Sequence, residues 1–284
     1  MHVCPMVTPG TPPVPHVGGP VLPPCFVTVM TMGPPDARIM DMCTCVGPPD
    51  PISQGSSTVL VGGMPTSRMG DATSHGGALV VGAPTVLVGG PPVTLAVAPG
   101  QTPAFVAALQ AALSTILPTR SGVEWLRQMG VNGRTVTFQE TATANGFCTP
   151  ANGANAGNGT GTNSTIDWNP THNVTDSGLP GAQGTPGANV ILAHEMVHAL
   201  HNANGNESNG PNDNFPGQSG TSARNEERST VGTGGSPINT PTGPQANPPD
   251  YSGNVPTENS FRDDLGIPRR PTYYPSNWPG GPPW

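Results

Sequence analysis

Short runs of β-branched and apolar residues alternate with glycine- and proline-rich turns along the first 90 residues. The runs Thr28–Met30 and Thr58–Leu60 occupy equivalent places 30 positions apart, and a partial third copy begins at Thr85. Runs of this kind predict brief strands joined by tight turns. Because the copies keep one register, the region is an internal repeat, and we expect a small all-β module of short hairpins.

Beyond residue 100 the spacing of apolar residues changes to that of a helix. Apolar side chains recur at every fourth position from Phe105 to Leu117, which predicts a helix between Pro103 and Pro118. Residues 123–126 predict a second short helix.

Strand and loop patterns follow these helices. Residues 134–140 alternate between polar and apolar side chains and predict a strand. Residues 146–165 are rich in Gly, Asn, Thr and Ser, so we expect a long exposed loop there. An edge strand is expected at residues 165–168.

An uncharged stretch at residues 189–200 is interrupted only by His194, Glu195 and His198. The spacing of four residues places both imidazoles on one face of the predicted helix. Neutral imidazoles suit zinc, and Glu195 can take a proton from the attacking water without occupying a coordination position. Burial of these groups without such a role would cost desolvation free energy. The pattern predicts a zinc site with Glu195 as the catalytic base.

A catalytic zinc site needs a third protein ligand. The metzincin pattern is excluded, because His201 stands where it requires Gly and Asn204 where it requires His. On a predicted helix downstream, Glu226 follows Asn225 and so resembles the Asn-Glu string that supplies the glutamate ligand of gluzincins. This resemblance favours Glu226, with Glu227 as the alternative and Asp213 as a weaker rival. The expected donors to the tetrahedral oxyanion are Tyr251, Tyr273, Tyr274 or His201.

The register of the N-terminal repeat also aligns metal-ligating residue types. It places Cys45 opposite His75, and His16 lies about one further repeat upstream. Three converging turns would bring these side chains together, and Cys4 or Cys43 could supply a fourth ligand for tetrahedral zinc. Because such a small β-structure has little core, we expect the metal to contribute much of its folding free energy.

The amino-acid composition limits the kinds of structure and binding partner that the chain can have. The 39 glycines and 38 prolines among 284 residues would be typical of disorder without the repeat. Ten Lys and Arg residues are scattered along a chain of net charge −7, which argues against nucleic-acid binding. We expect no membrane span and no signal peptide. Four of the five cysteines lie in the first 45 residues beside histidines, so metal ligation competes with disulfide formation.

Residues 1–95 resemble the PAAR-repeat proteins, which sharpen the spike of type VI secretion and related contractile injection machines. The matching strings are Pro15–Pro20, Pro35–Arg38, Gly55–Val59, Ser67–Asp71 and His75–Gly77. The resemblance implies a short β-cone whose base sits on a trimeric VgrG-type spike. It also implies a tip that binds zinc or iron through His16, Cys45 and His75. The cysteine-rich string Asp41–Cys45 leaves open which cysteine points inward.

Residues from about 100 onward resemble the NleD-like family of bacterial effector zinc peptidases. The strings that carry this likeness are residues 194–198, 226–232 and 257–266. The resemblance implies a mainly helical (α+β) zincin-like fold and a gluzincin-like glutamate ligand. It also implies endopeptidase activity against a protein of the attacked cell, although it does not carry over a particular substrate.

The sequence thus predicts two domains with a short joining segment. Residues 1–95 form a metal-tipped spike cap, residues 96–104 a Pro/Gly connector, and residues 105–284 a zincin-like metallopeptidase. We expect a monomeric effector that loads on a VgrG-type trimer and is injected into target cells, where it cleaves a protein substrate. An immunity protein would be a further partner if the prey were kin. The alternative is a non-enzymatic structural spike tip with a folded C-terminal adaptor.

Overall fold

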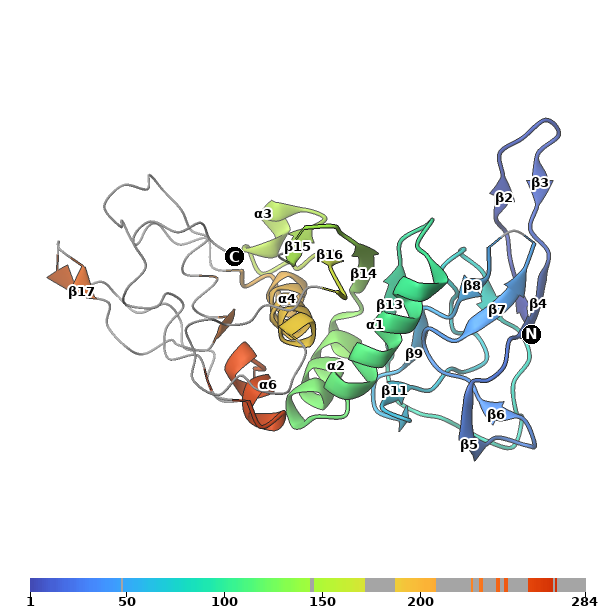
Figure 1. The fold of residues 1–284 in the computed structure, drawn as a ribbon, viewed down its shortest axis with the longest axis horizontal. Coiled ribbons are helices and arrows are strands. Elements are labelled where there is room, and N and C mark those ends of the chain that lie inside the picture. Colours follow the sequence, from blue (N-terminus) through green and yellow to red (C-terminus); the bar gives the residue numbers. More distant parts are fainter. Residues whose placement is uncertain are drawn as a thin grey trace. The chain divides into compact units, whose positions relative to one another are not determined.

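The computed structural model of the 284-residue chain describes residues 1–46, 48–143, 146–171, 187–207, 226, 230–231, 239–240, 243–244, 255–267 and 269. The chain divides into two compact units (Figure 1). The first comprises Met1–Pro118 with Leu126–Glu140, and the second comprises Thr119–Trp125 with Thr141–Trp284. No helix in the described part of the chain is long and apolar enough to cross a membrane.

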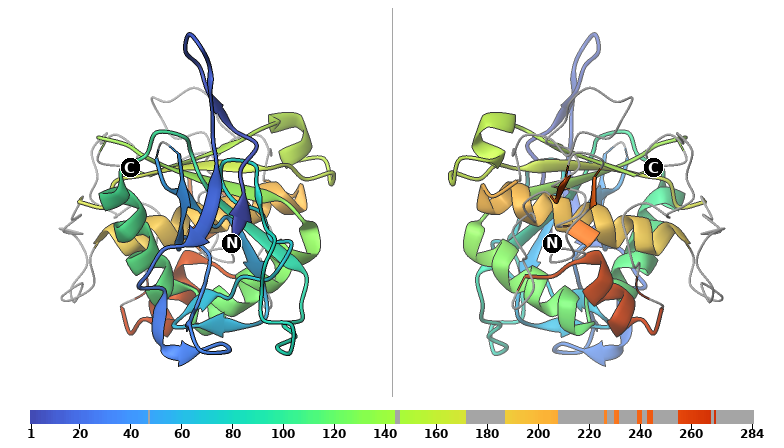
Figure 2. Two further views of the ribbon diagram at one scale, coloured as in Figure 1. Left: turned by 90° about the vertical axis from the view of Figure 1, so that its right-hand side faces the viewer. Right: turned by 90° about the vertical axis from the view of Figure 1, so that its left-hand side faces the viewer.

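The first unit begins with short antiparallel strands, as the repeat predicts. Adjacent hairpins pair β2 with β3, β5 with β6 and β10 with β11, while β7 lies between β4 and β8 and β1 pairs with β12. The β2–β3 hairpin projects from the other strands of this unit (Figure 2). The strands are β1 (His2–Val3), β2 (Val7–Thr8), β3 (Val14–Pro15), β4 (Gly18–Val21), β5 (Phe26–Met30), β6 (Pro35–Asp36), β7 (Met42–Cys45), β8 (Asp50–Pro51), β9 (Gln54–Ser56), β10 (Leu60–Val61), β11 (Met64–Pro65) and β12 (Ala78–Leu79).

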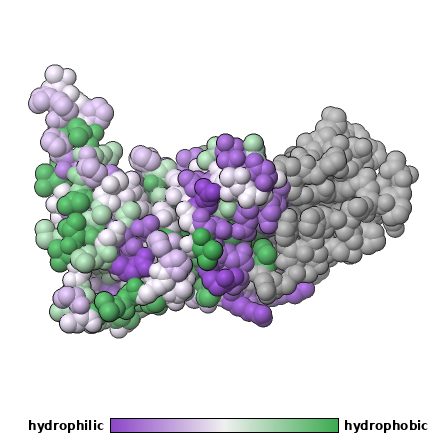
Figure 3. Space-filling view, turned by 180° about the vertical axis from the view of Figure 1, so that it is seen from behind, coloured by the Kyte–Doolittle hydropathy of each residue, from purple (hydrophilic) through white to green (hydrophobic). Residues whose placement is uncertain are grey.

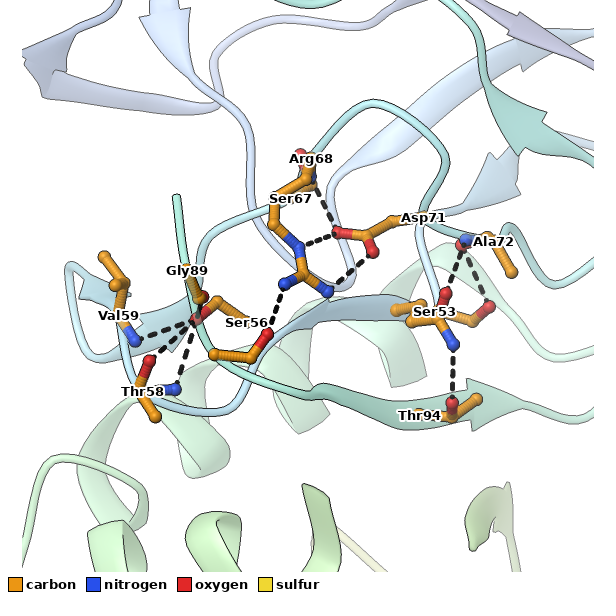
Figure 4. Close-up of polar contacts among 12 residues, drawn as sticks. Ser53, Ser56, Thr58, Val59, Ser67, Arg68, Asp71, Ala72, Gly89 and Thr94 are labelled. Carbon is orange, nitrogen blue, oxygen red and sulfur yellow. Dashed lines mark hydrogen bonds and ion pairs between the residues drawn. The ribbon is translucent and has the colours of Figure 1, made fainter. Parts of the chain in front are cut away.

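Equivalent residues of the repeat close equivalent turns. The carboxylate of Asp41 accepts a hydrogen bond from the Arg38 backbone N–H at 2.8 Å, and Asp71 accepts one from the Arg68 N–H at 2.7 Å. In both copies the arginine side chain also reaches the aspartate, at 3.4 Å for Arg38 and at 2.9 Å for Arg68. Figure 4 shows the contact of Arg68 with Asp71. The register of 30 residues in the sequence therefore corresponds to a repeated hydrogen-bonded turn.

Two glycines of the repeat allow the backbone of β1 to pass close by. A Cβ atom at Gly18 would lie 2.2 Å from the carbonyl oxygen of His2, and one at Gly77 would lie 1.9 Å from that of Val3. Both distances are far below van der Waals contact, so only glycine fits at either position. Gly18 and Gly77 each stand two residues after a predicted metal ligand, His16 and His75.

The N-terminal strands bury few apolar side chains. One small cluster contains Cys43, Ile52 and Leu79. Many valines and methionines remain on the surface, such as Val17 at 64% exposure, and Figure 3 shows apolar residues dispersed over this part of the molecule. Little hydrophobic free energy is therefore available to hold the hairpins together.

Residues interpreted as a connector partly belong to a strand. Strand β13 (Pro92–Val97) pairs antiparallel with β9 and parallel with β14 (Thr135–Glu140). The sequence interpretation gave too much weight to the flanking prolines, whereas the side chains of Val93, Leu95 and Val97 alternate inward and are buried. The predicted connector is therefore wrong for residues 96 and 97.

Helix α1 (Pro103–Ile116) confirms the helix predicted between two prolines. Its N-cap residue Thr102 accepts a hydrogen bond from the Phe105 N–H at 3.1 Å, and Pro103 begins the first turn. Gln110 of α1 donates a hydrogen bond of 2.8 Å to Asp41, so this helix packs on the repeat. Helix α2 (Arg120–Asn132) is longer than the four residues predicted.

The second unit combines helices with a short hairpin. Strand β15 (Phe147–Pro150) pairs antiparallel with β16 (Ser164–Trp168), and α3 (Gly153–Ala156) lies between them in the chain. The prediction of a loop over residues 146–165 is thus wrong at both ends, because the backbone pairs there despite the polar composition. The remaining elements are α4 (Gly187–Asn204), β17 (Asn239–Thr240), β18 (Gly243–Pro244) and α6 (Glu258–Asp264).

Two buried indoles fix the position of α4. Trp168 donates a hydrogen bond of 2.7 Å to the Ala188 carbonyl at the start of the helix. Trp125 donates one of 2.6 Å to the carbonyl of Met196, midway along it. Both side chains are at most 2% exposed, so these contacts hold the helix in a dry core.

Candidate metal centres

The first unit gathers four side chains with metal-ligating atoms. Cys4, His16, Cys45 and His75 each offer one atom, and these atoms lie within 4.8 Å of one another. The His16 Nδ1 atom is 3.2 Å from Cys45 Sγ, and the His75 Nδ1 atom is 3.8 Å from Cys4 Sγ. Zinc bonds of ordinary length in a tetrahedral site would separate sulfur from nitrogen by about 3.6 Å. The donor set therefore fits a zinc ion.

The structure distinguishes the two cysteines that the sequence left open. Cys43 is fully buried against Ile52 and Leu79, in the small apolar cluster. Cys4 instead lies among the other three side chains of the cluster. Cys4 is thus the fourth member of this group.

Thr8 and Asp50 form hydrogen bonds that orient the two histidines of the cluster. Thr8 Oγ1 lies 2.7 Å from the His16 Nε2 atom, which leaves Nδ1 directed toward Cys45. Asp50 accepts a hydrogen bond of 2.9 Å from the backbone N–H of His75. Burial lowers the pKa of His75, opposed by Asp50, and so favours the neutral imidazole that binds metal.

His2 is a neighbour of this cluster that the sequence analysis missed. Its Nε2 atom lies 3.3 Å from Asp50 Oδ2, and its side chain is 2% exposed. His2, Cys4 and Asp50 form a second group with ligand atoms within 4.8 Å. The sequence carried no signal for His2, because it lies outside the register of the repeat.

In the second unit, α4 presents two imidazoles to each other. The Nε2 atoms of His194 and His198 lie 3.1 Å apart, and the ring planes are inclined by 73°. Two imidazole ligands of one tetrahedral zinc ion would have nitrogen atoms about 3.3 Å apart. The pair therefore fits two positions of a zinc site, as the spacing of four residues predicts.

Carboxylates contact the other ring nitrogen of each imidazole. Glu258 Oε2 lies 2.8 Å from His194 Nδ1, and Glu226 Oε1 lies 3.2 Å from His198 Nδ1. Glu226 Oε1 is also 2.5 Å from His201 Nδ1. The predicted third ligand Glu226 thus approaches His198 from the side of Nδ1, away from the nitrogen that faces His194.

The backbone at Gly146 passes close to the Glu195 side chain. Its side chain is 7% exposed, and Gly146 approaches it so closely that a Cβ atom there would be 2.8 Å from Glu195 Cγ. The same atom would be 2.7 Å from Ile191 Cγ2. The segment that begins β15 is thus packed on the face of α4 that carries Glu195.

Charges near α4 shift several pKa values. Although burial opposes it, the proximity of His201 and His198 holds the pKa of Glu226 well below its ordinary range. Burial, together with the nearby Glu226, raises the pKa of Glu207. Burial also raises the pKa of Cys148, which lies on β15, to about 12. The Glu226 carboxylate is therefore ionised, while Cys148 carries its proton at neutral pH.

Several predicted residues lie outside the described part of the chain. These are Glu227 and Asp213, weighed as ligands, and Tyr251, Tyr273 and Tyr274, weighed as donors to the oxyanion. His201, the fourth candidate donor, is fully buried and contacts Glu226 through Nδ1.

Comparisons with known proteins match both parts of the chain. The Peptidase_M91 family model, which describes an effector protein, matches residues 95–273. The model of the PAAR motif matches residues 11–81. A search of curated proteins finds no match. The two matches confirm both resemblances drawn from the sequence, together with the two-part fold of hairpins followed by a mixed sheet and helices.

Proposed function

Since the chain belongs to the Peptidase_M91 effector family and carries a PAAR motif, we propose that it is a zinc-dependent endopeptidase delivered by an injection machine. The observation that carries the proposal is the pair of Nε2 atoms, 3.1 Å apart, on one face of α4. Two unprotonated nitrogens at this distance fit two ligand positions of one zinc ion. The site would be completed by a third protein ligand, for which the sequence predicts Glu226 or Glu227.

The residues of α4 suggest how peptide hydrolysis would proceed. A bound zinc ion would polarise the scissile carbonyl and make water a better nucleophile. His194 and His198 would hold the ion, and Glu195 would accept the proton of the attacking water at its carboxylate. Glu195 would then pass that proton to the leaving amine. The burial of Glu195 keeps the carboxylate close to the reacting atoms and away from bulk water.

For the cap we propose zinc or iron bound by Cys4, His16, Cys45 and His75. Support comes from the four ligand atoms that lie within 4.8 Å of one another and from the few apolar side chains that the N-terminal strands bury. A metal ion would cross-link the end of β1, the segment between β3 and β4, β7 and the turn before β12.

We further propose that the cap docks on a VgrG-type spike trimer of a type VI or related contractile system. The PAAR motif supports this partner, and so does the exposed apolar strand β5. Val27 is 61% exposed and Met30 is 58% exposed, and both lie on β5. Exposed apolar surface of this kind is typical of a protein interface.

Two measurements on the full chain test the proposal. Elemental analysis should find zinc that is lost when His194 and His198 are both changed to alanine. Target-cell extract incubated with the chain should show new protein N-termini by mass spectrometry, and these should be absent with Glu195→Gln. If the chain binds metal only in the cap and produces no new termini, the non-enzymatic spike-tip alternative is supported instead.

A further inference from the structure

We propose that Glu226 and Glu258 are positioning residues, each of which fixes one zinc-binding imidazole by bonding to its Nδ1 atom. Glu226, in this assignment, does not itself bind the metal. The inference rests on the proposed zinc site of α4 and assigns to its surroundings a role that neither the sequence nor the family matches supply.

The contact of His194 with Glu258 determines which nitrogen carries the proton. An ionised carboxylate can only accept hydrogen bonds, so the Nδ1 atom of His194, 2.8 Å from Glu258 Oε2, must be the donor. In a neutral imidazole the other nitrogen is then a bare acceptor. The Nε2 atom of His194 therefore presents a lone pair.

The same reasoning applies to His198. Its Nδ1 atom lies 3.2 Å from Glu226 Oε1 and 3.3 Å from Thr230 Oγ1. Donation from Nδ1 to the Glu226 carboxylate leaves Nε2 of His198 without a proton. Two lone pairs then face each other across 3.1 Å, an arrangement that repels unless a cation lies between them.

The position of Glu226 separates it from that cation. The two nitrogens of an imidazole direct their bonds along strongly diverging lines. An oxygen that accepts from Nδ1 therefore lies on the far side of the ring from a metal bound to Nε2. Glu226 occupies that far side, and its Oε1 atom is also 2.5 Å from His201 Nδ1. One carboxylate oxygen thus joins two imidazoles instead of an imidazole and a metal.

Both carboxylates are themselves held in place. Arg262 donates a hydrogen bond of 2.6 Å from Nε to Glu258 Oε1, and the Glu258 residue is only 1% exposed. Glu226 is 4% exposed and accepts from Thr230 Oγ1 at 3.3 Å in addition to the histidines. Buried, multiply bonded carboxylates of this kind restrict the rotation of the rings that they contact.

The test compares Glu226→Gln and Glu226→Ala in the full chain loaded with Co²⁺. The spectrum of a His194→Ala, His198→Ala double variant contains only the cobalt bound by the cap. Subtracting it from the spectrum of each chain leaves the absorption of cobalt bound at α4. With Glu226→Gln, the band positions should be unchanged, because glutamine can still accept a bond from Nδ1. Metal affinity should fall by about 10–100-fold, and further with Glu226→Ala. Glu258→Gln should behave in the same way, and Glu140→Gln, an exposed glutamate, serves as the control.

Loss or displacement of the cobalt bands in Glu226→Gln, to the same extent as in Glu226→Ala, would make Glu226 a ligand and overturn the inference. Circular dichroism melts establish that the glutamine variants are folded. Failure of the proposed function gives a different result. If α4 bound no metal, the wild-type chain and the double histidine variant would show the same absorption.

Discussion

The Nε2 atoms of His194 and His198 face each other at 3.1 Å, with a carboxylate behind each ring. This arrangement places two imidazole nitrogens face to face on α4, each ring held by a carboxylate. It makes metal content the most direct property to measure, because the two candidate centres of the chain draw on separate residues.

Changing His194 and His198 together to alanine should remove about one zinc ion per chain, since it deletes both nitrogen ligands of one site. The cap cluster should keep its metal and so provides an internal control. Elemental analysis of the purified full chain measures both. An unchanged metal content would show that α4 does not form a zinc site.

Glu195→Gln should abolish most proteolysis while zinc remains bound. Removal of a general base lowers the rate by about 10²–10⁴-fold, and glutamine keeps the shape of the side chain. The rate at which new N-termini appear in target-cell extract, with zinc content measured in parallel, checks this. A fully active Glu195→Gln chain would refute the proposed mechanism.

Gly146→Ala should impair activity with only a modest loss of stability. The added methyl group would lie 2.7 Å from Ile191 Cγ2 and 2.8 Å from Glu195 Cγ, so the catalytic side chain must move. Overpacking of this kind costs about 1–3 kcal/mol. Gly153→Ala is the matched control, because a Cβ atom there meets nothing within 4 Å. Equal activity in both variants would contradict the expected displacement of Glu195.

Cys45→Ser should lower both the cap metal content and the melting temperature, whereas Cys25→Ser should change neither greatly. Cys25 lies outside the cluster, and its thiol donates to the Leu22 carbonyl, a bond that serine can also make. Bound metal at a thousandfold excess over its Kd stabilises the folded chain by about 4 kcal/mol. Calorimetry with and without a chelator measures the effect. A chelator-insensitive melting temperature in the wild type would argue against a structural metal.

Cys148 should resist alkylation in the native chain. Burial raises its pKa from 9.0 to about 12, so at pH 8 the reactive thiolate is roughly a thousandfold rarer than in unfolded chain. Because the folded pKa is the higher one, the contribution of this thiol to stability is complete below pH 9 and declines as pH rises toward 12. Mass spectrometry after iodoacetamide treatment, with and without urea, compares the rates. Similar rates in both conditions would contradict a raised pKa for this thiol.

The spacing of residues along the sequence correctly predicted several local features of the structure. The offset of 30 residues selected three side chains that the structure brings together in the cap cluster. The spacing of four predicted that His194 and His198 share one face of α4. The helix that begins at Pro103 also followed from the spacing of its apolar residues between two prolines.

The remaining features depend on contacts that no short pattern records. The flanking prolines made part of β13 read as a connector. Its pairing with β9 joins residues 36 to 40 positions apart, from Pro92 with Ser56 to Thr94 with Gln54, and no local pattern shows it. His2 and Glu258 approach their histidines only through the tertiary fold. The side of His198 on which Glu226 lies is likewise a matter of packing, so the sequence could supply the residue without its orientation.

The glycines beside β1 restrict which residues the repeat can carry at one position but not at another. Gly18 and Gly77 follow His16 and His75 by two residues, and neither can bear a side chain because β1 passes so near. The ligand position carries histidine in those two copies and cysteine at position 45. Exchange of histidine for cysteine at that position is therefore compatible with the same backbone, whereas a single methyl group at Gly18 or Gly77 is not.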